Sequence, residues 1–497
     1  MQQMSTAWPW SSPACATSVI ELRRMIFAAL IALALLTCAQ ASTIQSGQDI
    51  QAAINSARAG DIILVGPGEH NAFEVDRALT IAGQEGSVLH AAIQKPAIQV
   101  SSDGVKISGF KIIGVGKDST AKFNYFMNNP AAAAGKRLDM PNAAVVISSS
   151  DVILENISIF GAQVGVKAEN VGNLSIQNTT LESCESGVAL LQCRSSKVAG
   201  CSFSNCKKYG LDAEECQGIE FNSNRIVNTS GSGALFKESE VCEIQDNVFS
   251  GNAFGLSLWR STLSQVARNR ADHNYYGILI TDSSNNNTIT DNLAEDNSRG
   301  EIIAGFGIGI SLEENSSYNI VTRNTAKGNF NGLEVSRGCK FNVVYGNDVS
   351  DNSHGIRLNE NRNNLIFGNN FYDNNINAYE NASQNIWNTT RGNYYDDYHG
   401  KDEDGDGIGD QPYALRGQDS KSYDHRPMIA FCRNASIDYA TLKDDVKKYA
   451  TYELADDEVP AYQLKGGTIV IASKIPTSPP KWSDSKPLDV TTPPFYK

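Results

Sequence analysis

The chain has 497 residues, a formal net charge of -13 at pH 7 and no basic stripe. An acidic chain of this kind is a poor binder of nucleic acid, so we expect no nucleic-acid partner. Repeats fill most of the chain, so its length divided by a typical domain size would overcount the domains.

The N-terminus has the layout of an export signal. Two arginines precede an apolar run from Met25 to Leu36, and Ala39-Gln40-Ala41 offers a cleavage site between small residues. This order predicts a secretory signal peptide over residues 1–41. Residues 1–24 are interpreted as additional sequence ahead of Met25, which would then be the initiator. The apolar run is short for a membrane span. We therefore expect no transmembrane anchor after cleavage, and a secreted or cell-surface protein, or a periplasmic one in a Gram-negative source.

Residues 42–147 are predicted to contain irregular β-coils that follow a short capping helix. One helical face of the segment SGQDIQAAINSARAGD carries Ile50, Ala53, Ile54 and Ala57. Gly60 supplies a stop signal. An amphipathic helix here would cover the open end of a solenoid, which otherwise exposes strand edges. Residues 116–142 break the pattern and are expected to protrude as a loop.

A glycine followed by an aliphatic residue returns at a nearly constant interval between positions 148 and 382. These marker glycines are Gly165, Gly187, Gly210, Gly233, Gly255, Gly277, Gly309, Gly332 and Gly355. The series is expected to end at Ala378-Tyr379, with alanine in place of glycine. One longer step, from Gly277 to Gly309, locates an insertion around Ser298–Gly307. A fixed period of roughly 22 residues is typical of a solenoid.

The composition of each repeat identifies the kind of solenoid. Short runs of alternating polarity, such as NIVTRN and FNVVYGN, lack a helical period, and no leucine-rich frame is present. Three short strands and three turns fill about 22 residues, which makes one coil of a parallel β-helix. Coils would stack about 4.8 Å apart. The marker glycines are expected at coil corners.

Asparagines recur at two fixed positions in the repeat. Eight residues before the markers lie Asn247, Asn269, Asn324, Asn347 and Asn370. Three residues before them lie Asn252, Asn274, Asn329, Asn352 and Asn375. Identical side chains one coil apart lie over each other, so their amides are predicted to form hydrogen-bonded ladders. Asparagine also tolerates the left-handed conformation that coil corners need.

Two cysteine pairs follow the same period. Cys193 and Cys216 are one repeat apart, as are Cys184 and Cys206, and each pair is predicted to stack on neighbouring coils. We interpret these cysteines as small residues that fill a narrow core. Disulfides between coils and a soft-metal site are the alternatives.

Residues 383–430 are aromatic, acidic and glycine-rich, and they are predicted to cap the C-terminal end. The carboxylates of Asp402, Asp404, Asp406 and Asp410, with Gly407 at the turn, match the first nine positions of a calcium loop. Ile408 would add its backbone carbonyl, and we expect a structural calcium ion. The match fails at Tyr413, where an EF-hand has glutamate, so Asp397 or Asp424 would have to complete the site.

Residues 431–497 are predicted to form a small appendage of helix and strand over 434–475. A Pro-rich tail follows it, which is expected to be extended or disordered.

The repeats and the segment that follows them resemble the NosD-type right-handed β-helix proteins, especially the exported ones of methanogenic archaea. The matching segments are Asn385-Ile386-Trp387, Gly392–Tyr398, Asp402–Asp410 and Asp424–Met428. The resemblance covers roughly residues 44–430. It implies a pectin-lyase-like fold that is shared with pectate lyases and with carbohydrate-binding and sugar-hydrolase modules. The family name comes from a copper-maturation factor, but this chain has no His- or Met-rich cluster, so copper is not carried over.

A catalytic interpretation depends on the segment from Tyr209 to Glu215. It begins like the tyrosine-glycine-x-aspartate motif of alginate epimerases, but Ala213-Glu214-Glu215 stands where Pro-His-Asp should follow. The missing histidine argues against epimerisation. Asp212 and Glu214 could act as the paired carboxylates of a hydrolase, but we favour solvated charges on a coil face.

We therefore predict an exported protein of a single all-β domain that binds or organises polysaccharide or cell-envelope glycan without catalysis. Its long stacked faces carry repeated Tyr and Asn, with Tyr275 and Tyr276 as examples, and suit repeating sugars. A polysaccharide lyase, C5-epimerase or glycoside hydrolase is the alternative. A copper-related maturation factor is the lesser alternative.

Overall fold

The computed structural model describes residues 41–44, 49–115, 142–297, 307–417 and 422–432, two further strands at Ala461–Lys465 and Thr468–Ala472, and residues 444, 447 and 448. Three predicted segments lie outside the described residues except for the last residue of each: the signal peptide (1–41), the protruding loop (116–142) and the insertion (298–307). The Pro-rich tail lies entirely outside them.

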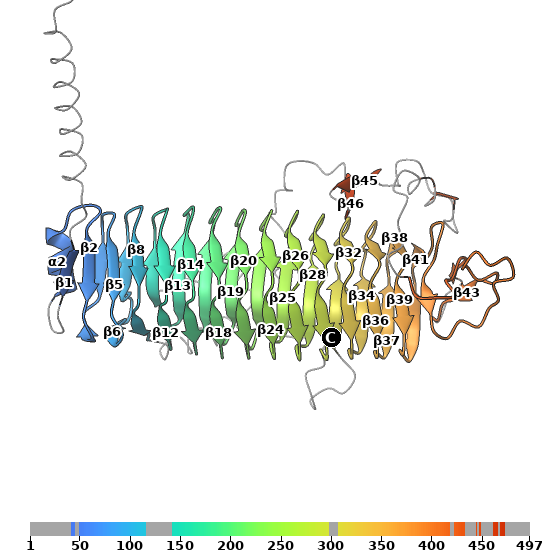
Figure 1. Ribbon diagram of the computed structural model, residues 1–497, viewed down its shortest axis with the longest axis horizontal. Helices are drawn as coiled ribbons and strands as arrows, with labels where there is room; N and C mark the ends of the chain where they lie inside the picture. Colours follow the sequence, from blue (N-terminus) through green and yellow to red (C-terminus); the bar gives the residue numbers. More distant parts are fainter. Residues whose placement is uncertain are drawn as a thin grey trace, which may run out of the picture.

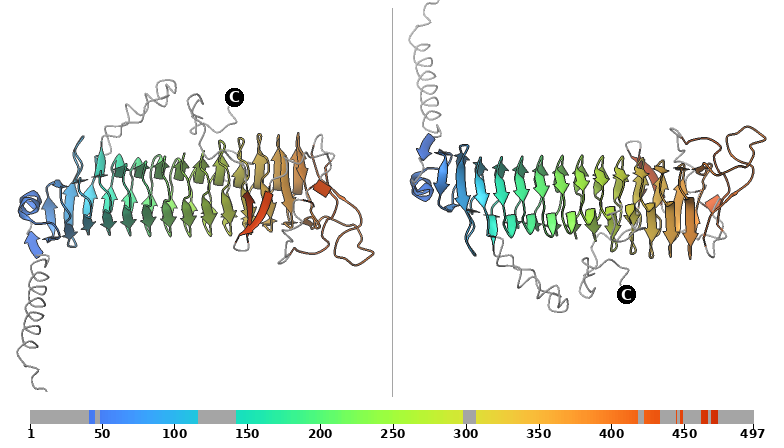
Figure 2. Two further views of the ribbon diagram at one scale, coloured as in Figure 1. Left: turned by 90° about the horizontal axis from the view of Figure 1, so that it is seen from above. Right: turned by 90° about the horizontal axis from the view of Figure 1, so that it is seen from below.

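The described chain winds into one elongated parallel β-helix whose three sheets run along its length (Figure 1). Each coil adds one short strand to each sheet, and strands of successive coils pair in parallel. Views from above and below show the same uninterrupted stack (Figure 2). The predicted all-β parallel β-helix is therefore confirmed.

Sheet A has fifteen strands: β1 (Ala41–Ile44), β2 (Ile62–Val65), β5 (Thr80–Gly83), β8 (Lys106–Ser108), β11 (Ile153–Glu155), β14 (Ser175–Gln177), β17 (Lys197–Ala199), β20 (Glu220–Asn222), β23 (Glu243–Gln245), β26 (Gln265–Ala267), β29 (Thr288–Thr290), β32 (Ile320–Thr322), β35 (Val343–Tyr345), β38 (Arg362–Phe367) and β41 (Gln384–Ile386).

Sheet B has fourteen strands: β3 (Gly68–His70), β6 (Ser87–His90), β9 (Lys111–Ile113), β12 (Ser158–Phe160), β15 (Thr180–Glu182), β18 (Ser202–Ser204), β21 (Arg225–Val227), β24 (Val248–Ser250), β27 (Arg270–Asp272), β30 (Leu293–Glu295), β33 (Thr325–Lys327), β36 (Asp348–Ser350), β39 (Asn370–Tyr372) and β42 (Tyr394–Tyr395).

Sheet C has thirteen strands: β4 (Phe73–Val75), β7 (Ile98–Val100), β10 (Ala143–Ile147), β13 (Val164–Glu169), β16 (Ser186–Leu191), β19 (Tyr209–Glu214), β22 (Ser232–Lys237), β25 (Phe254–Trp259), β28 (Tyr276–Thr281), β31 (Ile308–Leu312), β34 (Asn331–Ser336), β37 (His354–Asn359) and β40 (Ile376–Asn381). Two antiparallel pairs, β43 (Tyr413–Ala414) with β44 (Tyr423–Asp424) and β45 (Ala461–Lys465) with β46 (Thr468–Ala472), complete the described strands.

The single described helix, α2 (Ile50–Ser56), lies at the N-terminal end of the stack (Figure 1). The side chain of Asp49 accepts a hydrogen bond from the backbone N–H of Gln51 at 3.0 Å and so caps the helix. Ile50 and Ile54 are fully buried in the core that runs on through the coils. The predicted capping helix is therefore confirmed.

The marker glycines lie within the strands of sheet C, and not at coil corners as predicted. A Cβ atom on Gly309 would lie 2.5 Å from the backbone oxygen of Gly332 and 3.0 Å from the side-chain nitrogen of Asn329. Glycine is therefore required by the close approach of neighbouring coils, and not by a left-handed conformation.

The end of the repeat series also differs from the prediction. Ile356 pairs with Ala378, so Asn377 occupies the position that Gly355 holds one coil earlier. The prediction that Ala378 replaces the glycine was wrong by one residue, because the last step is one residue shorter than the steps before it.

Three asparagine ladders line the inside of the coil turns. The first contains Asn224, Asn247, Asn269, Asn292, Asn324, Asn347, Asn369 and Asn393. The second contains Asn252, Asn274, Asn297, Asn329, Asn352 and Asn374. The third contains Asn287, Asn319, Asn342, Asn364 and Asn385. The predicted ladders are confirmed, with Asn369 and Asn374 in place of Asn370 and Asn375.

Each rung of a ladder holds two hydrogen bonds. The side-chain amide of Asn247 donates to Oδ1 of Asn269 at 2.9 Å, and the backbone N–H of Asn247 donates to the same oxygen at 3.0 Å. The left-handed conformation is adopted by the residue that precedes each ladder asparagine, as in Asp246 with φ 57° and Arg268 with φ 54°. The ladders thus satisfy the turn backbone and fix the register of the coils.

The stacked cysteines are free thiols inside the core. Cys184, Cys193, Cys206 and Cys216 are all buried. Burial raises the pKa of the Cys184 thiol to about 11, so it is an inert core group. This agrees with the interpretation of the cysteines as small residues that fill a narrow core.

The close approach at the marker glycines can be tested by substitution. Gly309→Ala should lower the free energy of unfolding by about 1–3 kcal/mol, because a methyl group has no room between coils. The control is Gly172→Ala, whose added Cβ would lie 3.7 Å or more from its neighbours and should leave stability unchanged or slightly higher. Equal melting temperatures for the two variants would contradict this assignment.

Candidate functional site

The outer face of sheet C is the broadest surface of the solenoid. From β13 onward its strands are five or six residues long, whereas most strands of sheets A and B have three. In β19 the core takes Leu211 and Ala213, so Tyr209, Asp212 and Glu214 lie on the outer face. Each coil therefore presents about three outward side chains here, in register with the next coil.

The two carboxylates that the sequence singled out lie together on this face. The ammonium group of Lys237, one coil away, lies 2.6 Å from Oε1 of Glu214. Burial, together with the charge of Glu214, raises the pKa of Asp212 to about 7. The carboxyl of Asp212 therefore titrates near neutral pH, whereas Glu214 is ion-paired with Lys237. Carboxyls in such unlike environments can supply an acid and a base.

A second ionisable cluster lies farther along the same face, and sequence reasoning missed it. Glu313 is paired with Arg337 and accepts a hydrogen bond from Ser311 at 2.8 Å. Glu334, on the next coil, lies 3.4 Å from the guanidinium of Arg357. Burial, together with the charge of Glu313, raises the pKa of Glu334 to about 6. The spacing of one repeat between Glu334 and Arg357 was the signal that could have revealed the cluster.

Aromatic side chains lie on the face between the two clusters. The rings of Phe254 and Tyr276 stack with centroids 5.4 Å apart, and Tyr275 contacts Tyr276 at the same distance. Trp259 is held by Asp282, which accepts a hydrogen bond from its indole nitrogen, and Lys237 lies 5.9 Å from its ring centre. The face therefore combines apolar rings with fixed polar groups.

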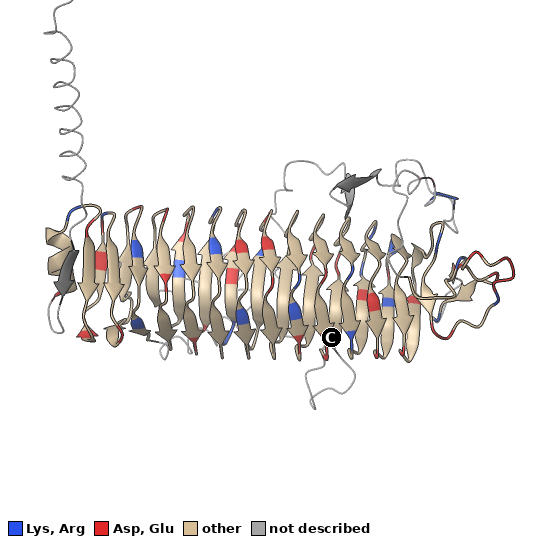
Figure 3. Cartoon of the chain, in the orientation of Figure 1, with Lys and Arg blue, Asp and Glu red and all other residues tan. Residues whose placement is uncertain are grey.

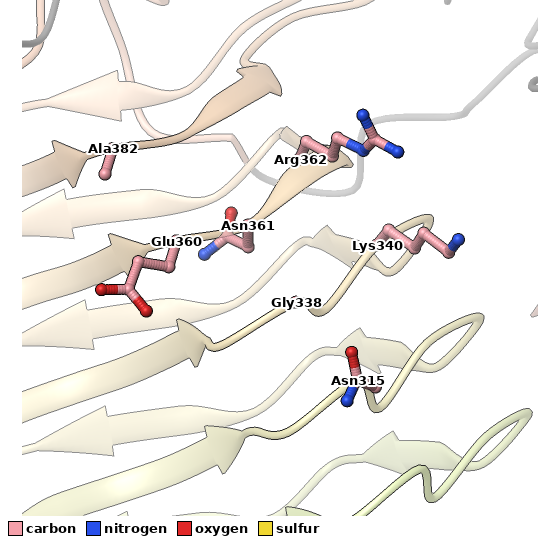
Figure 4. Close-up of a pocket in the computed structure, with 7 residues that line it drawn as sticks. All are labelled: Asn315, Gly338, Lys340, Glu360, Asn361, Arg362 and Ala382. Atoms are coloured by element: carbon pink, nitrogen blue, oxygen red, sulfur yellow. The ribbon is translucent and has the colours of Figure 1, made fainter.

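A shallow pocket of about 450 Å³ adjoins this face where the coils turn from sheet C to sheet A (Figure 4). Its lining residues are Asn315, Gly338, Lys340, Glu360, Asn361, Arg362 and Ala382. The side chains of Lys340 and Arg362 extend away from the strands in the same direction (Figure 4). The pocket is lined by polar side chains of both charges and lies to one side of the second cluster.

On the side of the solenoid seen in Figure 3, Lys and Arg are interspersed with Asp and Glu, and the loop at the C-terminal end carries acidic residues. Neither sign of charge forms a stripe along the coils in this view.

An aromatic block lies over the C-terminal end of the core. Trp387 and Tyr395 are almost fully buried. Tyr395 stacks on Phe371 of the coil below it, with centroids 5.6 Å apart, and on Tyr413 beyond it at 3.8 Å. Asp424 accepts hydrogen bonds from the backbone and side chain of Asn393, which ends the first ladder.

The acidic loop brings three of the four predicted carboxylates together. One oxygen from each of Asp402, Asp404 and Asp406 lies within 4.8 Å of the others. Asp402 also accepts hydrogen bonds from the backbone of Gly405 and Gly407.

The other predicted calcium ligands lie outside this group. Asp410 accepts from the backbone of Glu403, and the N–H of Ile408 donates to Asp406. Asp397 accepts from Tyr413, and Asp424 is buried in the cap. Calcium binding through Asp402, Asp404, Asp406, Ile408 and Asp410 stays a prediction, with three clustered carboxylates in its favour.

A family model described as periplasmic copper-binding protein (NosD) matches residues 125–305 and 296–400, more than half of the chain. The chain belongs to the NosD family. No curated protein matches it in sequence. The resemblance noted in the sequence is thus confirmed, together with the parallel β-helix that it implied.

Solved structures of low sequence identity resemble this NosD chain. The A-module of the mannuronan C-5 epimerase AlgE6 of Azotobacter vinelandii is 12% identical over 68% of this chain and 91% of its own, with a TM-score of 0.46. The Dettilon tailspike protein is 15% identical over 62% and 67%, at 0.49. The surface adhesin PfbA of Streptococcus pneumoniae is 12% identical over 65% and 92%, at 0.46. Similarities this weak carry no argument about function.

The close group of metal-binding side chains in the described part of this NosD chain does not fit copper. Within the described residues, the one close group of three or more potential metal ligands consists of aspartates. Carboxylate oxygens suit hard cations such as calcium, whereas copper prefers imidazole, thiolate or thioether ligands. The family description as periplasmic agrees with predicted export. No helix in the described part of the chain is long and apolar enough to cross a membrane.

Removing calcium should destabilise the cap of this NosD protein. An ion that binds only the folded loop adds roughly 2.7 kcal/mol at a hundredfold excess over its dissociation constant. Chelation should lower the melting temperature and fray the C-terminal coils first. Asp404→Ala with Asp406→Ala should have the same effect and abolish the response to chelator. Glu403→Ala, in the same loop but outside the group, is the control. Absence of calcium binding by titration calorimetry at millimolar metal would refute the site.

The raised pKa of Asp212 predicts a pH-dependent stability difference. The folded pKa of about 7 lies above the unfolded value of an aspartate, so ionisation of Asp212 opposes folding. Its destabilising effect is absent below about pH 4 and complete above about pH 7. Asp212→Asn should therefore raise the melting temperature more at pH 8 than at pH 5. An effect that is equal at both pH values would show that Asp212 is solvated.

Proposed function

We propose that this chain is an exported protein that binds polysaccharide along the outer face of sheet C. The observation that carries the proposal is the pair of half-buried rings of Phe254 and Tyr275, which pack against the buried ring of Tyr276 in a face that continues in register over many coils. Pyranose rings present apolar C–H surfaces that pack on aromatic rings, and hydroxyls that bond to polar side chains.

The geometry of the face suits a chain of repeating units. Successive coils are about 4.8 Å apart, which is close to the length of one sugar unit, so equivalent contacts can recur along the axis. The solenoid is rigid, so its side chains lose little freedom on binding a long ligand. Secretion or attachment to the cell surface belongs to the same proposal.

A polysaccharide hydrolase is the second candidate function. It is favoured by the unlike environments of Asp212, whose pKa is raised to about 7, and Glu214, which is paired with Lys237. If the protein binds polysaccharide without cleaving it, Asp212→Asn with Glu214→Gln should leave both the affinity for polysaccharide and the release of reducing ends unchanged. Loss of a measured release of reducing ends in that double variant would instead support hydrolysis.

The binding proposal is tested by removing one ring. Phe254→Ala should weaken the affinity for polysaccharide roughly tenfold, because the variant loses a half-buried aromatic ring on which a sugar would pack. Affinity electrophoresis or titration calorimetry would measure the change. Phe160→Ala is the matched control, since that ring is 47% exposed on the outer side of sheet B. Equal losses in both variants, or in neither, would contradict binding on sheet C.

A further inference from the structure

Two positively charged side chains stack one coil apart in the pocket where sheet C turns into sheet A (Figure 4). Lys340 and Arg362 form a parallel backbone bridge, so their Cα atoms lie about 4.8 Å apart. Neither side chain forms an ion pair with any residue in the described part of the chain. Glu360 also lines the pocket, but its carboxylate points away from both cations (Figure 4). Like charges this close repel each other, so the pair favours an anion placed between its two charged groups.

The same turn position on earlier coils does not bring like charges together. The described bridges of this row join Gly172 with Arg194, Arg194 with Gln217, Gln217 with Glu240, and Glu240 with Thr262. The side-chain amide of Gln217 donates a hydrogen bond to Glu240 at 2.8 Å. Lys340 and Arg362 depart from this pattern and concentrate two positive charges at one point of the stack.

An aromatic pair lies beside the two cations. The rings of Tyr318 and Phe341 stack with centroids 5.4 Å apart and an angle of 23° between their planes. The ammonium group of Lys340 lies 5.8 Å from the ring centre of Phe341. Phe341 is buried, whereas Tyr318 is partly exposed. One ligand can therefore contact both an apolar ring and the two cations.

The two rings stand on turns whose backbone does not suit them. Tyr318 and Phe341 have φ values of 60° and 58°, in the left-handed region, and each precedes an asparagine of the third ladder. Asn286 and Asn363 hold the equivalent places on the flanking coils, at 58° and 59°. Asparagine tolerates this conformation, whereas for a bulky side chain it is an outlier that costs stability. Outliers of this kind gather at functional sites, which supports a role for the rings in binding.

We infer that this pocket binds an acidic sugar unit, whose carboxylate lies between Lys340 and Arg362 and whose ring packs on Tyr318. Ammonium and guanidinium groups only donate hydrogen bonds, so they match a carboxylate, which only accepts them. The C–H surface of a sugar ring packs on an aromatic ring. The side-chain amide of Asn315, which also lines the pocket, can bond to a sugar hydroxyl.

The inference rests on the proposed function and names its substrate class, a polysaccharide that contains uronic acids. The pocket lies directly after the ends of β34 and β37, beside the outer face of sheet C. The chain as a whole carries a net charge of -13, so it repels a polyanion at long range. Binding of an acidic polysaccharide therefore depends on a local concentration of positive charge, such as this pair.

The test is titration calorimetry with hexagalacturonate and hexamannuronate as acidic probes and cellohexaose as the neutral probe. Wild-type protein should bind at least one acidic probe more tightly than cellohexaose. Lys340→Gln and Arg362→Gln should each weaken the affinity for that acidic probe about tenfold, because each removes a charge-assisted hydrogen bond. Neither should lower the melting temperature, since each relieves the repulsion within the pair. Tyr318→Asn, which restores the residue type of the flanking coils, should also weaken the affinity for the acidic probe.

Arg194→Gln is the matched control, because Arg194 is an exposed cation at the same turn position whose bridged neighbours are Gly172 and Gln217. It should leave the affinity for the acidic probe unchanged. Equal losses in Arg194→Gln and Arg362→Gln, unchanged affinity in Lys340→Gln and Arg362→Gln, or a preference for cellohexaose would overturn the acidic-sugar pocket and leave polysaccharide binding intact. Binding of no saccharide at all, in the probes and in a wider polysaccharide panel, would overturn both.

Discussion

The rest of the structure depends on one constraint, the register that links each coil to the next. Parallel backbone pairing sets this register in three sheets, and the asparagine ladders repeat it at the turns. In a ladder, one Oδ1 accepts from both the side chain and the backbone N–H of the preceding asparagine, as at Asn247 and Asn269. A slip of one residue would leave these buried donors unpaired, so the register is strongly fixed.

Register also assembles the surface chemistry. Lys237 lies against Glu214, and Arg357 against Glu334, because each pair is one repeat apart in sequence and one coil apart in space. Sheet C gains most from this arrangement, because its strands are the longest and present the most outward side chains per coil. The same close stacking that excludes a Cβ at Gly309 thus builds a continuous face for an extended ligand.

Much of the fold could be predicted because period and composition are local properties of the sequence. The capping helix and two of the three asparagine ladders followed from residue type and spacing. The one-residue shift at Asn377 could not, because coils that differ in length by one residue satisfy the same pattern. Asn292 and Asn297 were missed because the insertion before Gly309 hides their distance to the next marker. Asp212 and Glu214 share a face simply because they are two residues apart on a strand, whereas the cluster of Glu313 and Glu334 lies beyond that insertion and joins side chains of different coils.

In the proposed function, the outer face of sheet C, and not the fold family alone, determines what the protein binds. A crystal structure of the protein with a bound oligosaccharide tests it most directly. We expect sugar density along the outer side of sheet C between β25 and β40, with the long axis of the ligand parallel to the stack. Ordered sugar on the outer side of sheet A or sheet B, with sheet C bare, would contradict it.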